Sequence, residues 1–161
     1  MKKVAVLLLF VSTLISCSQD ITFNNVAAFQ GVKDNEGWKA EDAAASRSLN
    51  ALLTIKAVTF NETMTLTMPV PGAFIVQENV NGHMTYTLGS SEARKATYTR
   101  ISEDGDVFYQ TGDGQIIVTD YDGATISGKF HFNAINTNSL STAPHTVSVQ
   151  SGVFYKVPVT Q

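Results

Sequence analysis

The 161-residue sequence is poor in cysteine, in basic runs and in long apolar stretches, and each shortage excludes a class of protein. Cys17 is the only cysteine, so no intramolecular disulfide can form. No run of Lys and Arg exceeds two residues and acidic residues outnumber basic ones by 14 to 11, which argues against a nucleic acid partner, because nucleic acid binding depends on neutralising phosphates. The apolar run from Val4 to Ile15 is shorter than the roughly 20 residues that a membrane-spanning helix needs.

Sequence patterns of catalysis and cofactor binding are missing as well. The chain has no G-x-S-x-G elbow, no phosphate-binding P-loop and no G-x-G-x-x-G between a strand and a helix. His83, His131 and His145 have no partner at metal-ligand spacing, whereas a zinc site needs about three or four converging ligands. We therefore expect no cofactor, no metal site and no catalytic residues, and the protein is predicted not to be an enzyme. A hydrolase whose site is built from distant loops is a further alternative, because such sites are recognised by geometry.

Acidic residues gather in the segment ISEDGDVFYQTGDGQIIVTDYDG, residues 101–123. Calcium takes about six to eight oxygen ligands, which a loop of aspartates and glycines can supply. The spacing is not that of an EF-hand loop, and Asp and Gly are the ordinary residues of tight turns. We interpret these acids as turn residues rather than as a calcium site.

The amino-terminal segment has the three parts of a bacterial signal peptide. Lys2 and Lys3 precede the apolar run, and the small residue Ser16 precedes Cys17. The tetrad Leu14-Ile15-Ser16-Cys17 resembles a lipobox, in which the thiol is diacylated and the chain is cut just before the cysteine. An ordinary secretory signal or an uncut anchor is the alternative. The predicted organisation is a signal peptide over residues 1–16, lipidated Cys17 with a short tether over residues 17–25, and a β domain over residues 26–161.

Lipidation at Cys17 would hold the protein on a membrane surface without a spanning segment, because two or more acyl chains give firm anchoring. Loss of Lys2 and Lys3 leaves 9 basic and 14 acidic residues, a formal net charge of −5 for the mature chain. The residue after the cysteine is Ser18 rather than the aspartate that retains enteric lipoproteins in the inner membrane. By resemblance to enteric lipoproteins that lack the retention aspartate, we expect an outer-membrane lipoprotein of the cell envelope, facing the periplasm or the cell surface.

Beyond the tether, the sequence has the pattern of short β-strands. Turn-forming residues, among them Gly112–Gly114 and Ser151-Gly152, separate runs rich in Val, Ile, Thr, Tyr and Phe. In Glu62–Met68, apolar residues alternate with threonines, as a half-buried strand requires. The predicted fold class is all-β, a single antiparallel β-sandwich or flattened barrel of about 9 to 11 strands, with a lipocalin-like barrel as the alternative.

The clearest local unit is a hairpin between Gly114 and Ile135. Asp122-Gly123 is predicted to form its two-residue turn, of type I′. On the returning strand, Ile126, Gly128, Phe130, Phe132 and Ala134 are predicted to share one face.

Two further segments have less regular patterns. Thr146–Val159 is predicted to form strands around a turn at Ser151-Gly152. The apolar residues of its alternating pattern are Val147, Val149, Val153, Tyr155, Val157 and Val159. Glu41–Ala51 is rich in alanine and begins with acids, but its periodicity is poor, so we predict a loop or at most a short helical turn.

Taken together, these segments resemble a family of small uncharacterised lipoproteins of Bacteroidota. The features that carry the resemblance are the lipobox, the Gly-Trp-Lys-Ala stretch at 37–40, the Ile-Ser-Gly-Lys-Phe-His-Phe-Asn-Ala strand at 126–134 and the closing Val-Gln-Ser-Gly-Val-Phe-Tyr-Lys-Val-Pro-Val at 149–159. The resemblance covers most of the mature chain and is most specific in its carboxy-terminal half. The members are domains of unknown function, so the resemblance implies an all-β lipoprotein and transfers no binding or catalytic residues.

Aromatic residues are the candidates for ligand binding, because exposed rings can stack on sugar rings. Trp38, Tyr109 and Tyr121 are the candidates, and Trp38, between Gly37 and Lys39, is the first to test. The alternative for Trp38 is that it fills the core or plugs one end of the domain.

The leading functional hypothesis is a non-catalytic lipoprotein, anchored through Cys17, that binds a protein or glycan partner or another extracellular ligand. The alternative is a lipocalin-like carrier of a small apolar molecule, which would need an open apolar interior. The residues predicted to line such an interior would serve equally in a closed core, and they are Ile126, Phe130, Phe132, Val147 and Val149.

Overall fold

The computed structural model describes residues 28–72, 78–80, 83–103 and 105–160, and these residues form eleven strands and no helix. The predicted all-β class and strand number are confirmed. The predicted signal peptide, Cys17 and the predicted tether lie outside the described residues. The strands are β1 (Ala28–Lys33), β2 (Glu36–Lys39), β3 (Asp42–Arg47), β4 (Leu52–Val58), β5 (Glu62–Pro69), β6 (Glu78–Val80), β7 (His83–Leu88), β8 (Lys95–Arg100), β9 (Val107–Tyr121), β10 (Thr125–Asn136) and β11 (Thr146–Thr160).

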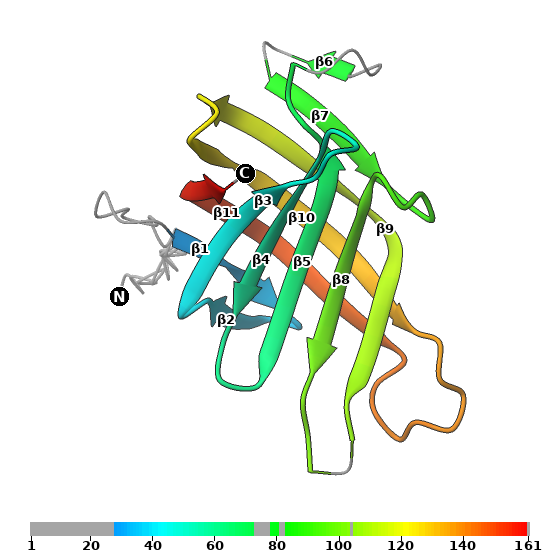
Figure 1. Cartoon of the computed structure of the whole chain (residues 1–161). Coiled ribbons are helices and arrows are strands. Elements are labelled where there is room, and N and C mark those ends of the chain that lie inside the picture. The colour runs from blue at the N-terminus through cyan, green and yellow to red at the C-terminus, as the bar shows by residue number, and fades with distance from the viewer. Residues whose placement is uncertain (1–27, 73–77, 81–82, 104, 161) are drawn as a thin grey trace, which may run out of the picture.

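Seven strands close into a flattened barrel, in the order β11, β3, β4, β5, β8, β9, β10 and back to β11. Neighbours in this ring are antiparallel except β11 and β3, which run parallel where Val159 pairs with Ala45 and Thr160 with Ser46. An odd number of strands cannot alternate in direction all the way round, so one parallel contact is unavoidable. Figure 1 shows β3, β4, β5 and β8 as a layer in front of β9, β10 and β11.

Two hairpins extend the sheet beyond the ring. The β1–β2 hairpin is added to β11, on the edge that β3 joins further along. The β6–β7 hairpin is added to β9, past the residues that pair with β8. The long strands β9 and β11 therefore each hold two neighbours on one edge while β10 covers the other edge.

The length of β9 and β11 corrects two of the predicted turns. Gly112–Gly114 and Ser151-Gly152 lie at register shifts inside continuous strands, where a bulge bends the chain without ending the strand. Ser151 and Lys156 have positive φ values of 50° and 47°. Each bulge in β11 moves the buried face by one residue.

The turn between β9 and β10 differs from the predicted type I′ turn. The Asp122 N–H donates to the Thr125 carbonyl at 3.3 Å, which makes Gly123 and Ala124 the central residues. Of the residues in this turn only Gly123 has a positive φ, 87°, as in a type II′ turn with glycine first. The Asp122 carboxylate accepts the N–H groups of Ala124 and Thr125 at 2.8 and 2.6 Å and so stabilises the turn.

Strand β3 corrects the prediction for Glu41–Ala51. Ala43 and Ala45 face the core, while their neighbours along the strand are exposed. The helix propensity of alanine is outweighed because β3 pairs along its whole length with β4 and closes the ring against β11.

The interior is filled by aromatic rings that lie over glycines. Gly128 of β10 is opposite Phe154 of β11, and Gly152 of β11 is opposite Phe130 of β10. A Cβ atom on Gly128 would lie 2.4 Å from the Phe154 ring, and one on Gly152 would lie 2.5 Å from the Phe130 ring. Phe29 packs on Phe130 with ring centroids 4.7 Å apart. The five residues that sequence alone left open between a cavity lining and a closed core, Ile126, Phe130, Phe132, Val147 and Val149, all belong to one buried cluster.

Candidate functional site: the loop end of the barrel

Four connections lie at one end of the barrel, which we call the loop end, and their described residues are 34–35, 59–61, 101–103 with 105–106, and 137–145. Strand register places them together, because Glu62 at the start of β5 pairs with Arg100 at the end of β8, and Tyr109 near the start of β9 pairs with Asn136 at the end of β10. The last three connections lie on one side of the molecule, at the bottom of Figure 1. The Ile101 N–H also donates to the carbonyl of Asn61 at 2.8 Å.

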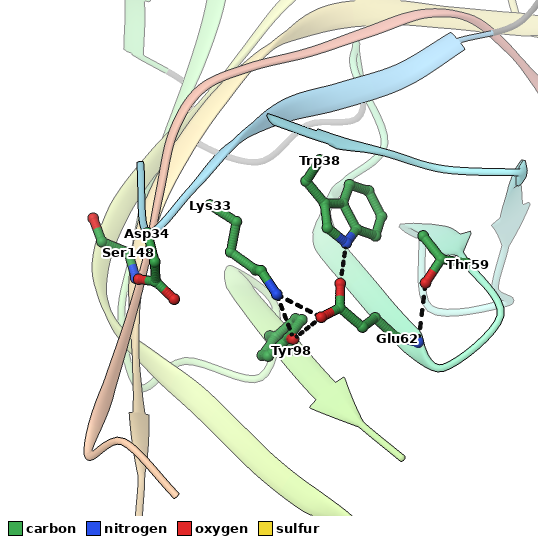
Figure 2. A network of polar contacts seen from close by, with 7 residues as sticks. All are labelled: Lys33, Asp34, Trp38, Thr59, Glu62, Tyr98 and Ser148. Atoms are coloured by element: carbon green, nitrogen blue, oxygen red, sulfur yellow. Dashed lines mark hydrogen bonds and ion pairs between the residues drawn. The ribbon is translucent and has the colours of Figure 1, made fainter. Parts of the chain in front are cut away.

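Side chains from four strands meet inside the loop end, as Figure 2 shows, and we call them the Glu62 cluster: Lys33 of β1, Trp38 of β2, Glu62 of β5 and Tyr98 of β8. Lys33 Nζ lies 2.5 Å from Glu62 Oε1 and donates to the Tyr98 hydroxyl at 2.9 Å. The Tyr98 hydroxyl donates to Glu62 Oε1 at 2.5 Å, and the Trp38 indole N–H donates to Glu62 Oε2. One carboxylate therefore joins the β1–β2 hairpin to the opposite wall of the barrel.

The electrostatics of the cluster favour a fixed ion pair. Burial alone would raise the pKa of Glu62, but hydrogen bonds from Lys33, Tyr98 and Trp38 and the charge of Lys33 outweigh it and lower the pKa below its ordinary value. Burial, followed by the hydrogen bond to the Glu62 carboxylate, raises the pKa of Tyr98. Glu62 is therefore ionised and Tyr98 protonated at neutral pH. Both carboxylate oxygens already accept hydrogen bonds, so the cluster has a structural role and fixes the β1–β2 hairpin to β5 and β8.

The three aromatic residues predicted as ligand-binding candidates do not lie together. Trp38 is 6% exposed and packs edge-on against Phe29, with ring centroids 6.0 Å apart, which agrees with the core-filling alternative. Tyr109 is buried beside Tyr98, with ring centroids 5.5 Å apart. Tyr121 is partly buried at the far end of β9, away from the loop end. Only Trp38 belongs to the Glu62 cluster.

Lys33, Glu62 and Tyr98 were not singled out by sequence, although one signal was present. Glu62 lies two, four and six residues before the buried residues Met64, Leu66 and Met68, so it belongs to the same face of β5. A charged residue in an inward-facing row needs partners, because an unpaired buried charge is costly. Its partners lie 29 and 24 residues before it and 36 residues after it, too far apart for sequence spacing to identify them.

The outer surface of the loop end carries exposed apolar side chains on three different connections. Phe60 is 92% exposed, Ile101 53% and Leu140 91%. Among the residues that the structure describes, Leu49 of the β3–β4 turn is the one large exposed apolar side chain at the opposite end. Strand residues next to the loop end, less exposed, add to the apolar surface: Val32, Phe108 and Ile135.

An open groove of about 500 Å³ lies between the β8–β9 and β10–β11 loops. Val107, Leu140 and Pro144 supply apolar wall, and Arg100 and Asp106 supply charged groups of opposite sign. The groove can therefore receive a segment that combines apolar and charged side chains.

Within the described ranges, no three His, Cys, Asp or Glu side chains lie close enough together to hold a metal ion. His131 is exposed on β10, on the face that the alternation predicted. None of the described residues forms a helix with the length and apolar character needed to cross a membrane.

Comparison with known proteins adds a family to this description. A search of the curated proteins and a search of the solved structures gave no match. Residues 25–158 match the model of the family described as "Domain of unknown function (DUF6252)", a range that includes every strand from β1 to β10 and most of β11. The chain therefore belongs to the DUF6252 family.

Proposed function

We propose that the protein is a lipid-anchored, non-catalytic binding protein of the outer membrane that holds its partner at the loop end. The observation that carries the proposal is the gathering of Phe60, Ile101 and Leu140 on three connections of the loop end. A hydrogen bond joins the first two connections, and the groove lies between the second and the third. Exposed apolar side chains that gather at one end of a domain favour an interaction site, because contact with a partner removes apolar surface from water.

The expected anchor at Cys17 is compatible with a free loop end. β1 begins at Ala28, which pairs with Tyr155 late in β11. At the end of β11, Thr160 lies beside Ser46, next to the β3–β4 turn. Both sites lie away from the loops at the bottom of Figure 1. A domain tethered through its amino terminus would present the loop end away from the membrane.

Two observations support surface binding over the alternatives. The Glu62 carboxylate is engaged on both oxygens and Tyr98 is held protonated, so the cluster offers no ready general base. The rings of Phe130 and Phe154 fill the space over Gly152 and Gly128, whereas a carrier needs an internal cavity of roughly a few hundred Å³.

The proposal is tested in living cells with the full-length chain. A photo-reactive amino acid at position 140 should cross-link a partner, whereas the same residue at position 49 should not, since both positions are exposed but lie at opposite ends. Cys17→Ser should move the protein from the membrane fraction to the soluble fraction. Equal cross-linking from both positions would contradict a specific loop end, and unchanged membrane retention would contradict lipid anchoring at Cys17.

A further inference from the structure

We infer that the partner at the loop end is a protein that presents an apolar hollow bordered by basic residues. The inference rests on the proposed function and adds the chemistry of the partner. Phe60 and Leu140 keep more than nine-tenths of their surface exposed, so they project beyond their neighbours as knobs. A surface that buries projecting side chains must be concave, because interfaces gain affinity by filling pockets with apolar anchors.

The charges around the knobs are mainly acidic. Asp34, Glu36, Glu103 and Asp106 are exposed on the connections of the loop end and on the strand residues that flank them. Among the described residues of these connections and the strand residues directly beside them, the Lys and Arg side chains are Lys33, which is paired with Glu62, and Arg100. This acidic border complements Lys and Arg on a partner, since opposite charges steer association and suppress wrong partners.

The same acidic border disfavours two other occupants. Anionic lipid headgroups would repel Glu103 and Asp106 beside the apolar tips, whereas surfaces that dock on membranes carry Lys and Arg beside their apolar residues. A second copy of the chain, docked loop end to loop end, would bring two acidic borders together, which is unfavourable.

The groove indicates how the partner's charges are placed. Leu140 and Val107 form apolar wall on either side of it, and Asp106 and Arg100 lie in the same lining, with Glu103 exposed on the β8–β9 loop beside it. An apolar side chain inserted between the two loops would bring its neighbours in sequence close to the Asp106 carboxylate. We therefore expect a Lys or Arg within a few residues of the inserted apolar residue.

The first experiment identifies the occupant. Photo-reactive amino acids are placed at positions 60 and 140 of the full-length, lipidated chain in its own cells, with position 49 as the matched exposed control. The cross-linked peptides are then sequenced by mass spectrometry. The expected product from positions 60 and 140 is a protein segment that combines apolar residues with Lys or Arg and does not appear from position 49.

The second experiment measures the chemistry with the identified partner, purified, and the full-length chain in detergent. Leu140→Ser should weaken binding about tenfold, on the scale of a lost interface anchor. Glu103→Gln with Asp106→Asn should weaken it several-fold and reduce its dependence on salt. Leu49→Ser and Asp120→Asn, both exposed and at the other end of the barrel, should leave the affinity unchanged.

The outcomes separate this inference from the proposed function. Cross-links at positions 60 and 140 to lipid, to glycan or to a second copy of the chain would overturn the inference and leave loop-end binding in place. A protein partner whose affinity is insensitive to salt and to the acidic substitutions would overturn it too. No specific cross-link from either position would overturn both.

Discussion

Replacement of Glu62 by Gln tests whether the Glu62 cluster fastens the β1–β2 hairpin to the barrel. Glutamine keeps the shape of the side chain but removes its charge. The partly buried Lys33 ammonium group therefore loses its counter-ion. The amide also cannot accept all of the hydrogen bonds that the carboxylate accepts from Lys33, Tyr98 and Trp38. Because Lys33 and Trp38 both belong to the hairpin, we expect the hairpin to loosen and the free energy of unfolding to fall.

The size of the effect follows from the contacts and their exposure. A hydrogen bond to a charged group contributes roughly 1.5–3 kcal/mol, and removal of one partner of a fully buried ion pair costs roughly 3–5 kcal/mol. The side chains of Lys33 and Glu62 remain 18% and 13% exposed, so water relieves part of the penalty. We expect a loss of about 2–4 kcal/mol at neutral pH. The matched control is Glu92→Gln, which breaks the more exposed pair with Lys95 and should cost less than about 1 kcal/mol.

The pH dependence gives a second readout of the same substitution. The pKa of Glu62 is lowered in the folded state, so its ionisation stabilises the fold. That contribution is complete above the pKa of glutamate in the unfolded chain and is lost as the pH falls through the lower pKa of the folded state. The difference between the wild-type chain and Glu62→Gln is therefore largest at neutral pH and shrinks in acid.

Urea unfolding followed by tryptophan fluorescence measures this difference directly, because Trp38 is the only tryptophan and bonds to Glu62. Hydrogen exchange over residues 28–39 would report whether the hairpin loosens. The reasoning is refuted if Glu62→Gln costs no more than Glu92→Gln, or if its cost does not change with pH.

Three further predictions concern the barrel wall and its turns. In thermal unfolding, Gly128→Ala should cost at least about 2 kcal/mol, because the new Cβ would lie 2.3 Å from the Ile117 carbonyl oxygen and 2.4 Å from the Phe154 ring. The control Gly89→Ala, which has open space around the new Cβ, should be tolerated in the same assay. Phe154→Ala should cost about 3–5 kcal/mol, and the double variant with Gly128→Ala should lose less than the sum of the single losses, since the ring no longer opposes the Cβ. Asp122→Ala should lower the melting temperature at neutral pH and have little effect in strong acid. Backbone hydrogen bonds from Thr125 and Ala124 lower the pKa of Asp122 in the folded state. The stability that the carboxylate contributes is therefore present above the ordinary aspartate pKa and is lost as the pH falls through the lower pKa of the folded state. A melting temperature shifted equally at all pH values would contradict the assigned role of that carboxylate.

Alternation predicted the buried faces well where the strands are regular. In β10, the predicted row from Ile126 to Ala134 is the buried row, because side chains two residues apart share a face of a sheet. In β11 the same reasoning was wrong only at Val153 and Tyr155, since the bulge at Ser151 shifts the buried face by one residue and the bulge at Lys156 shifts it back, so that Val157 is buried as alternation predicts. Phe154 is consequently buried, while Val153 and Tyr155 are only partly so.

Glycine was the least reliable signal, because it serves turns and close packing alike. At Gly123 it supplies the positive φ of a turn, as predicted for that hairpin. At Gly128 and Gly152 it leaves room for the rings of Phe154 and Phe130 inside continuous strands. Sequence shows the same residue in each case, and only the opposite strand distinguishes them.

The sequence by itself determined the all-β class, the number of strands and the outward or inward face of the regular strands, because β-propensity and alternation act over a few neighbouring residues. Tertiary structure decided the closure of the ring through β3, the partners of Glu62 and the gathering of Phe60, Ile101 and Leu140 at one end. Each of these depends on strand pairings between residues tens of positions apart. Local preferences do not encode such pairings, since they follow from how the whole sheet closes around its aromatic core.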